Sequence, residues 1–125
     1  MTDKPLRGLR ILVVEDNALL AMTVDSILQN AGAEVAGPVG TLSEAEQVAA
    51  AEPLSGALLD IKLNSDEIWS VARILIDRGV PFIFCSGHFD RDSLPREWST
   101  VPILTKPARA RQIVERLAGV ICAKS

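Results

Sequence analysis

The sequence has no tyrosine, one histidine and two cysteines among its 125 residues. Cys85 and Cys122 lack the paired spacing of metal ligands, so neither a zinc site nor a disulfide framework is expected. We expect Cys85, which ends an apolar run, to be a buried hydrophobe and Cys122 to be a surface thiol. The scarcity of aromatic residues also weakly opposes a flavin pocket.

Excess positive charge and long apolar runs are absent too. The formal net charge is −3, and no clustered basic face is visible. Sequence-independent nucleic-acid binding needs a strong basic footprint, so we expect no nucleic-acid partner. No apolar run reaches the roughly 20 residues that span a bilayer, and the polar start lacks the apolar core of a signal peptide. The sequence therefore predicts a cytoplasmic protein without a membrane partner.

The overall amino-acid composition is typical of one globular domain. Apolar residues make up 48% of the chain and charged residues 23%, which is ordinary for an α/β protein. A length of 125 residues suits one domain with a single core region. We therefore expect residues 1–125 to form one domain, with residues 1–8 as a polar N-terminal tail.

Short apolar runs alternate with helical patterns along the chain. Strands are predicted at 10–14, 34–37, 56–60, 80–85 and 101–105. Helices are predicted after a cap at Asp16 or Asn17 as far as Ala31, at 42–51 behind a capping box that starts at Thr41, from Ser65 or Asp66 to Arg78, and at 108–120. The stretch 88–100 is irregular, with one weak helical turn. This alternation predicts a doubly wound parallel sheet with right-handed crossovers.

Reactive side chains follow four of these strands. Glu15 and Asp16 come after the first strand, Asp60 ends the third, Ser86 follows the fourth, and Lys106 follows the last. Ligands of open α/β sheets bind outside the carboxyl ends of the strands. We therefore expect three carboxylates, a hydroxyl and an ammonium group to meet in one site at that edge.

This set of groups favours phosphoryl transfer. Clustered carboxylates repel each other, and a bound divalent cation removes that cost. Oxygen ligands without nearby His or Cys favour a hard ion, and Mg²⁺ fits best. Lys106 and Ser86 would hold a small anion while Asp60, already ionised at neutral pH, attacks in line. The predicted product is an aspartyl phosphate.

The order and spacing of Glu15-Asp16, Asp60, Ser86-Gly87 and Lys106-Pro107 resemble the receiver domain of two-component response regulators. The resemblance covers essentially the whole chain and implies a flavodoxin-like (βα)5 fold, with strand order 2-1-3-4-5 and a short or irregular fourth helix. It implies Asp60 as phosphoacceptor and a Mg²⁺ ion held by Asp16, Glu15, Asp60 and the backbone carbonyl of Lys62. Ser86 and Lys106 would contact the phosphoryl group, with a cis bond between Lys106 and Pro107.

Residues 78–88 look like the PFxFATGY signature of a receiver subgroup common in alphaproteobacteria, with Cys85, Ser86 and His88 in place of Ala, Thr and Tyr. Ile103 stands where typical receivers carry an aromatic residue. The resemblance therefore implies that Ser86 and Ile103 occupy the positions that change conformation on phosphorylation in receivers. Ile103 lacks the aromatic ring that is usual there. Lys62 and His88 occupy the two positions that in receivers influence how fast the acyl phosphate hydrolyses.

The resemblance implies a single-domain regulator that takes its phosphoryl group from a histidine kinase or phosphotransfer protein and acts on a downstream protein. Its activity would be limited to self-phosphorylation and slow autodephosphorylation. Residues 88–100, the last strand and the last helix would form the partner face, and homodimerisation through it stays open.

Two other functions are alternatives to this one. A haloacid-dehalogenase-like phosphatase is less favoured, because such enzymes carry a second Asp two residues after the nucleophile, and Lys62 stands there in this chain. A degenerate receiver that only binds partners is the other alternative, and the complete acidic set opposes it.

The aromatic residues divide into two groups by pattern. Phe82 and Phe84 lie in an apolar strand, and with Leu104 they are predicted to be core. Trp69 and Trp98 are predicted to be more exposed, either packed on the surface or marking a partner site.

Overall fold

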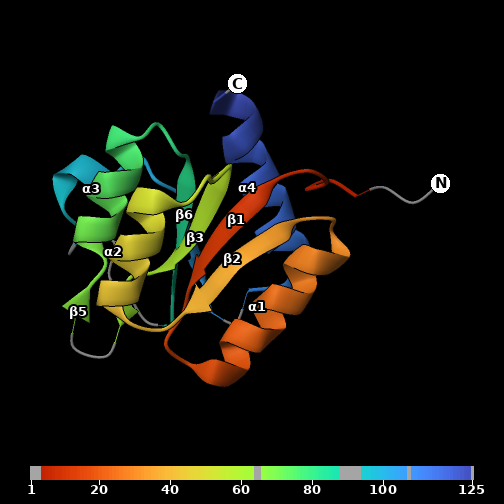
Figure 1. Ribbon diagram of the computed structural model, residues 1–125, viewed down its shortest axis with the longest axis horizontal. Coiled ribbons are helices and arrows are strands. Elements are labelled where there is room, and N and C mark those ends of the chain that lie inside the picture. The colour runs from red at the N-terminus through yellow and green to blue at the C-terminus, as the bar shows by residue number, and fades with distance from the viewer. Residues whose placement is uncertain (1–3, 64–65, 88–93, 107, 125) are drawn as a thin grey trace.

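The computed structural model describes residues 4–63, 66–87, 94–106 and 108–124. Within them, a five-stranded parallel sheet has the order β2-β1-β3-β6-β7 (Figure 1). These strands are β1 (Arg10–Val14), β2 (Glu34–Val39), β3 (Gly56–Asp60), β6 (Phe82–Ser86) and β7 (Ile103–Thr105). Counted among themselves they run 2-1-3-4-5, so the predicted doubly wound, flavodoxin-like fold is confirmed.

Helices cover both faces of the sheet. They are α1 (Ala18–Asn30), α2 (Leu42–Ala51), α3 (Trp69–Asp77) and α4 (Ala110–Lys124), with a 3₁₀ turn, η2 (Arg96–Trp98), before β7. Side chains of a strand alternate between the faces. On β1, Leu12 and Val14 join the core under α2 and α3, which lie side by side in Figure 1, while Ile11 and Val13 join the core under α1 and α4. No helix in the described part of the chain is long and apolar enough to cross a membrane.

Local sequence signals set the helix ends. Asn17 caps α1 by accepting a hydrogen bond from the backbone N–H of Leu20, as predicted. After α1, Gly32 has a φ of 98°, a conformation that glycine adopts without steric cost. Gly79 has a φ of 72° and plays the same part after α3.

The predicted cap at Thr41 is present, and it yields a stability prediction. Thr41 Oγ1 accepts a hydrogen bond from the Glu44 backbone N–H at 3.2 Å and donates one to Glu44 Oε1 at 3.0 Å. Thr41→Ala removes both, so the free energy of unfolding should fall by about 1 kcal/mol. Urea unfolding measures this, with Thr41→Ser as the matched control that keeps the hydroxyl. Equal stabilities for the two variants would contradict the capping role.

The segment after β3 differs from the prediction. Instead of a loop and a helix capped by Ser65 or Asp66, an antiparallel hairpin pairs β4 (Lys62–Leu63) with β5 (Asp66–Glu67), and α3 begins only at Trp69. The Ile68 backbone N–H donates to the carbonyl of Ile61 and closes the base of the hairpin. Asp66 therefore belongs to a strand, and α3 has no side-chain cap. Ser65 lies outside the described residues.

Other boundaries and burials also differ. α4 continues past Val120 to Lys124, because Ile121 still packs on the core; its side chain occupies the space that a Cβ at Gly56 would need. Trp98, predicted to be exposed, is buried in the α2/α3 core, and Trp69 packs against that core half-buried. Phe82, Phe84 and Leu104 are buried as predicted.

Candidate functional site

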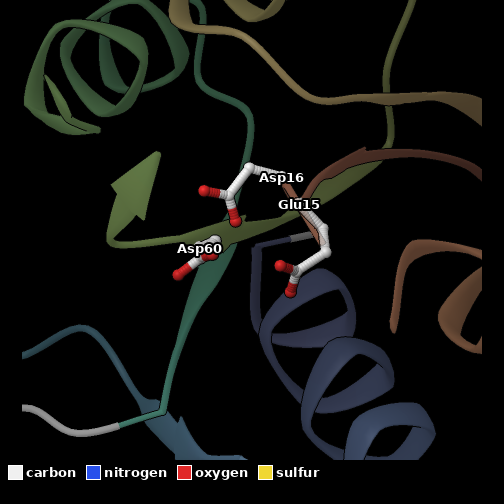
Figure 2. Close-up of side chains that lie close together, drawn as sticks. All are labelled: Glu15, Asp16 and Asp60. Atoms are coloured by element: carbon white, nitrogen blue, oxygen red, sulfur yellow. The ribbon is translucent and has the colours of Figure 1, made fainter. Parts of the chain in front are cut away.

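Three carboxylates meet at the carboxyl edge of the sheet. Glu15 and Asp16 directly follow β1, and Asp60 is the last residue of β3, so neighbouring parallel strands deliver them to one place (Figure 2). One carboxylate oxygen from each lies within 4.8 Å of the other two. Glu15 and Asp60 are buried, whereas Asp16 is exposed. The structure therefore brings these three carboxylates together at one edge of the sheet.

Lys106 supplies the counter-charge. Its Nζ lies 2.6 Å from Glu15 Oε1 and 3.0 Å from Asp60 Oδ2, and its side chain is only 15% exposed. The Lys106 backbone N–H donates to the carbonyl of Ser86 at 2.8 Å, which ties the lysine to the end of β6. The ammonium group thus bridges two buried carboxylates that come from different strands.

Burial and charge shift the protonation of this cluster. Burial raises the pKa of Asp60 to about 6, the hydrogen bond from Lys106 opposes that rise, and the charge of Glu15 adds to it. For Lys106, burial alone would lower the pKa, but its hydrogen bonds to Glu15 and Asp60 raise the pKa above its ordinary value. Lys106 is therefore a fixed cation at neutral pH, and Asp60 is ionised there at a cost in desolvation.

Three other predicted site residues, Ser86, Lys62 and Ile103, lie among the described residues. Ser86 is buried at the end of β6, one residue beyond Cys85, which pairs with Asp60 in the sheet. Lys62 is exposed, and its backbone N–H lies 3.4 Å from Asp60 Oδ1. Ile103 is half-buried on β7 and pairs with Phe84. His88 and the peptide bond to Pro107 lie outside the described residues.

Two contributors to the site were not predicted. The Asn17 backbone N–H donates to Glu15 Oε2 at 3.1 Å, so the residue that caps α1 also orients a site carboxylate. The β4–β5 hairpin holds the chain directly after Asp60, with Ile61 and Leu63 buried on either side of exposed Lys62. In the sequence, the alternation of apolar and polar residues at Ile61, Lys62 and Leu63 is the signal from which the strand could have been found.

The sequence was compared with protein-family models and with known proteins. No family model matches the chain. It is 34% identical over 79 residues to protein-glutamate methylesterase/protein-glutamine glutaminase 1 of Anaeromyxobacter dehalogenans, covering 62% of this chain and 22% of that protein. It is 28% identical over 101 residues to the transcriptional regulatory protein PdtaR of Mycobacterium tuberculosis, covering 78% of this chain and 49% of PdtaR. The chain thus spans half or less of the curated relatives it matches.

Solved structures match over nearly the whole chain. A response regulator receiver protein from Sinorhizobium medicae superposes with a TM-score of 0.79 at 26% identity, covering 96% of this chain and 99% of that one. The signal receiver domain of a modulated diguanylate cyclase from Desulfovibrio desulfuricans gives a TM-score of 0.82 at 27% identity, covering 93% and 95%. The chain has the fold of response regulator receiver domains.

The acidic group of this receiver fold suits a hard divalent cation. Glu15, Asp16 and Asp60 offer carboxylate oxygens within 4.8 Å of one another, and among the described residues no His or Cys joins this group. Carboxylate oxygens, with water completing the shell, are the ligands that Mg²⁺ takes in proteins. The exposure of Asp16 leaves room for such waters. The donor set therefore fits Mg²⁺.

The thiols of Cys85 and Cys122 should differ in their reactivity towards alkylating reagents. Burial raises the pKa of Cys85 to about 11, while Cys122 is exposed. At pH 8 roughly one Cys85 side chain in a thousand is then a thiolate, and it is also shielded from reagent. Iodoacetamide should add one group to the folded protein, at Cys122, and a second only in urea. The Cys122→Ser variant should take up none when folded, and rapid labelling of that variant would contradict the burial of Cys85.

Proposed function

We propose that the protein is a response regulator receiver that accepts a phosphoryl group on Asp60 from a histidine kinase or a histidine phosphotransfer protein. The observation that carries this proposal is the position of Asp60. It ends the central strand, has a carboxylate oxygen within 4.8 Å of two further acidic groups and forms an ion pair with the half-buried ammonium group of Lys106. The receiver proteins among its structural neighbours support the same conclusion.

The proposed transfer needs no general base. A carboxylate oxygen of Asp60 attacks phosphorus, and the bond between phosphorus and the donor's imidazole nitrogen breaks. The leaving imidazole keeps the electron pair and takes a proton from solvent. Lys106, whose Nζ already lies 3.0 Å from Asp60 Oδ2, would pair with a phosphoryl oxygen, and the Ser86 hydroxyl would donate to another.

The acidic group would hold Mg²⁺ during this transfer. Glu15, Asp16, Asp60 and the backbone carbonyl of Lys62 are the proposed ligands. The bound ion supplies positive charge that neutralises the phosphoryl oxygens. We assign no further enzymatic activity to the site, apart from slow hydrolysis of the acyl phosphate.

The finer assignments follow from the resemblance of residues 78–88 to the PFxFATGY signature. We place the protein in that receiver subgroup, with residues 1–125 acting as one receiver unit in the cytoplasm. Lys62 and His88 would set the lifetime of the acyl phosphate. Output would occur by contact with a downstream protein, without nucleic acid or membrane.

Intact mass after incubation with acetyl phosphate tests the proposal. In the presence of Mg²⁺ the native protein should gain the mass of one phosphoryl group, and with a chelator it should gain none. Hydroxylamine should then remove the added mass, because it cleaves acyl phosphates. If no mass is gained under any condition, the protein is not a phosphoacceptor for small donors, and a role in binding alone would replace the proposal.

A further inference from the structure

An aromatic cluster fills the core on the α2/α3 side of the sheet. It consists of Trp69 on α3, Phe82 and Phe84 on β6, and Trp98 on η2. The Trp69 and Trp98 rings are stacked, with centroids 6.4 Å apart and planes 16° apart. Phe84 packs edge-on against both, with centroid distances of 5.6 Å to Trp69 and 6.5 Å to Trp98. One ring of the strand therefore contacts two indoles from separate surface elements.

Trp98 is held in this cluster at a cost. It is 2% exposed, yet its Nε1–H finds no hydrogen-bond acceptor among the described residues. A buried donor without an acceptor costs free energy. On the outer side, the Arg73 guanidinium lies 5.2 Å from the centroid of the Trp98 ring and also pairs with Glu97, the residue before Trp98. Any movement of the indole that brings Nε1–H to water or to an acceptor would recover that free energy.

The strand that carries Phe84 also carries Ser86 of the candidate phosphorylation site. Phe84 and Ser86 are two residues apart on β6, so their side chains project to the same face of the sheet. Ile103 pairs with Phe84 from β7 and packs against the same core, but it brings no ring. Among the described residues, Trp98 is the ring that contacts Phe84 from the element before β7. Interiors are close-packed, so a shift of β6 that moves Phe84 also changes its contacts with Trp69 and Trp98.

We propose that Trp98 relays a change of state at Ser86, through Phe84, to the surface that η2 and α3 share. The relay rests on the proposed function, because phosphoryl binding is what moves Ser86. Through this relay, η2 and α3 would signal to a downstream protein. Ile103 cannot serve as the relay, because it has no aromatic ring. Trp98 is a positioning residue here and does not contact the phosphoryl group.

Tryptophan fluorescence can test the relay directly. The chain has two tryptophans, so Trp69→Phe leaves Trp98 as the sole indole and keeps an aromatic ring in the stack. Beryllofluoride with Mg²⁺ serves as the phosphoryl mimic, and ¹⁹F NMR reports its binding independently. We expect the Trp98 emission to shift to longer wavelength, because an indole that is 2% exposed can only gain contact with water. The shift should saturate at the same beryllofluoride concentration as the bound ¹⁹F signal.

Two variants separate the relay from simple packing. Trp98→Phe, with Trp69 retained, should show a smaller emission shift on saturation, because Trp69 sits on a regular helix. Adding Ser86→Ala to Trp69→Phe should remove the Trp98 shift at saturation, as judged by ¹⁹F NMR. A bound ¹⁹F signal with unchanged Trp98 emission overturns the relay and leaves the proposed function standing. The absence of any bound signal in the native protein overturns the proposed function, and the relay with it.

Discussion

The Asp60→Asn variant should gain no phosphoryl group from acetyl phosphate under conditions in which the native protein gains one. An amide oxygen carries no full negative charge and is a poor nucleophile towards phosphorus, so the attacking group is lost. The fold should survive, because the amide has the size of the carboxylate and avoids burying a charge. Burial raises the pKa of Asp60 to about 6, which means that the native site holds this charge at a cost. Intact mass and circular dichroism measure the two expectations.

Asp66→Asn is the matched control. Asp66 is an exposed carboxylate on β5, in the hairpin that follows Asp60, so the substitution removes the same charge from a neighbouring position. Its phosphoryl uptake should equal that of the native protein. Uptake by Asp60→Asn at the native level would show that Glu15 or Asp16 accepts the group, and the assignment of Asp60 would be wrong. A loss of uptake in both variants would point to a general effect of charge instead of a specific nucleophile.

The convergence of the site could be predicted because it depends on topology and very little on side-chain detail. Parallel strands share one carboxyl edge, so residues that end or follow β1, β3 and β6 must meet there. Glu15, Asp60 and Ser86 satisfy that rule, and Lys106 does so after β7. The helix starts at Asn17 and Thr41 were predictable for a different reason, since caps depend on hydrogen bonds within four residues.

The errors arise where tertiary packing overrides a local signal. Asp66 resembles a helix cap in sequence, but burial of Ile61, Leu63 and Ile68 pulls the segment into a hairpin and delays α3. Trp98 was predicted by its sequence pattern to be more exposed, but it is 2% exposed. Stacking on Trp69, which is 29 positions earlier in the chain, cannot be seen in a local window. The bridge from Lys106 to Glu15 was likewise unpredicted, because it depends on side-chain geometry inside the site.

That bridge yields the largest expected effect on stability. Lys106→Met keeps much of the side-chain volume but removes the ammonium that lies 2.6 Å from Glu15 and 3.0 Å from Asp60. Two buried carboxylates are then left without their counter-charge. Removing one partner of a buried ion pair costs about 3–5 kcal/mol, a large share of the roughly 5–15 kcal/mol that stabilises a typical domain. Urea unfolding at pH 8 in a chelator should show a loss of that order.

The dependence of this loss on pH follows from the direction of each pKa shift. The pKa of Lys106 is raised in the folded state, so its contribution is fully present below the unfolded value of 10.5 and is lost only as the pH rises through the higher folded value. The lysine therefore contributes its full charge at both pH 8 and pH 5. As the pH falls below about 6, Asp60 takes up a proton, and the loss caused by Lys106→Met should shrink.

Lys62→Met is the control for this prediction, because Lys62 is an exposed lysine whose backbone N–H lies 3.4 Å from Asp60 Oδ1. Its free energy of unfolding should stay within about 0.5 kcal/mol of the native value. If Mg²⁺ occupies the acidic group, adding it should restore part of the stability of Lys106→Met, since the ion replaces the missing positive charge beside Glu15 and Asp60. An equal and small loss in both variants would mean that solvent, not Lys106, neutralises the two carboxylates. The ion pair would then have no role in holding β1 and β3 together at the site.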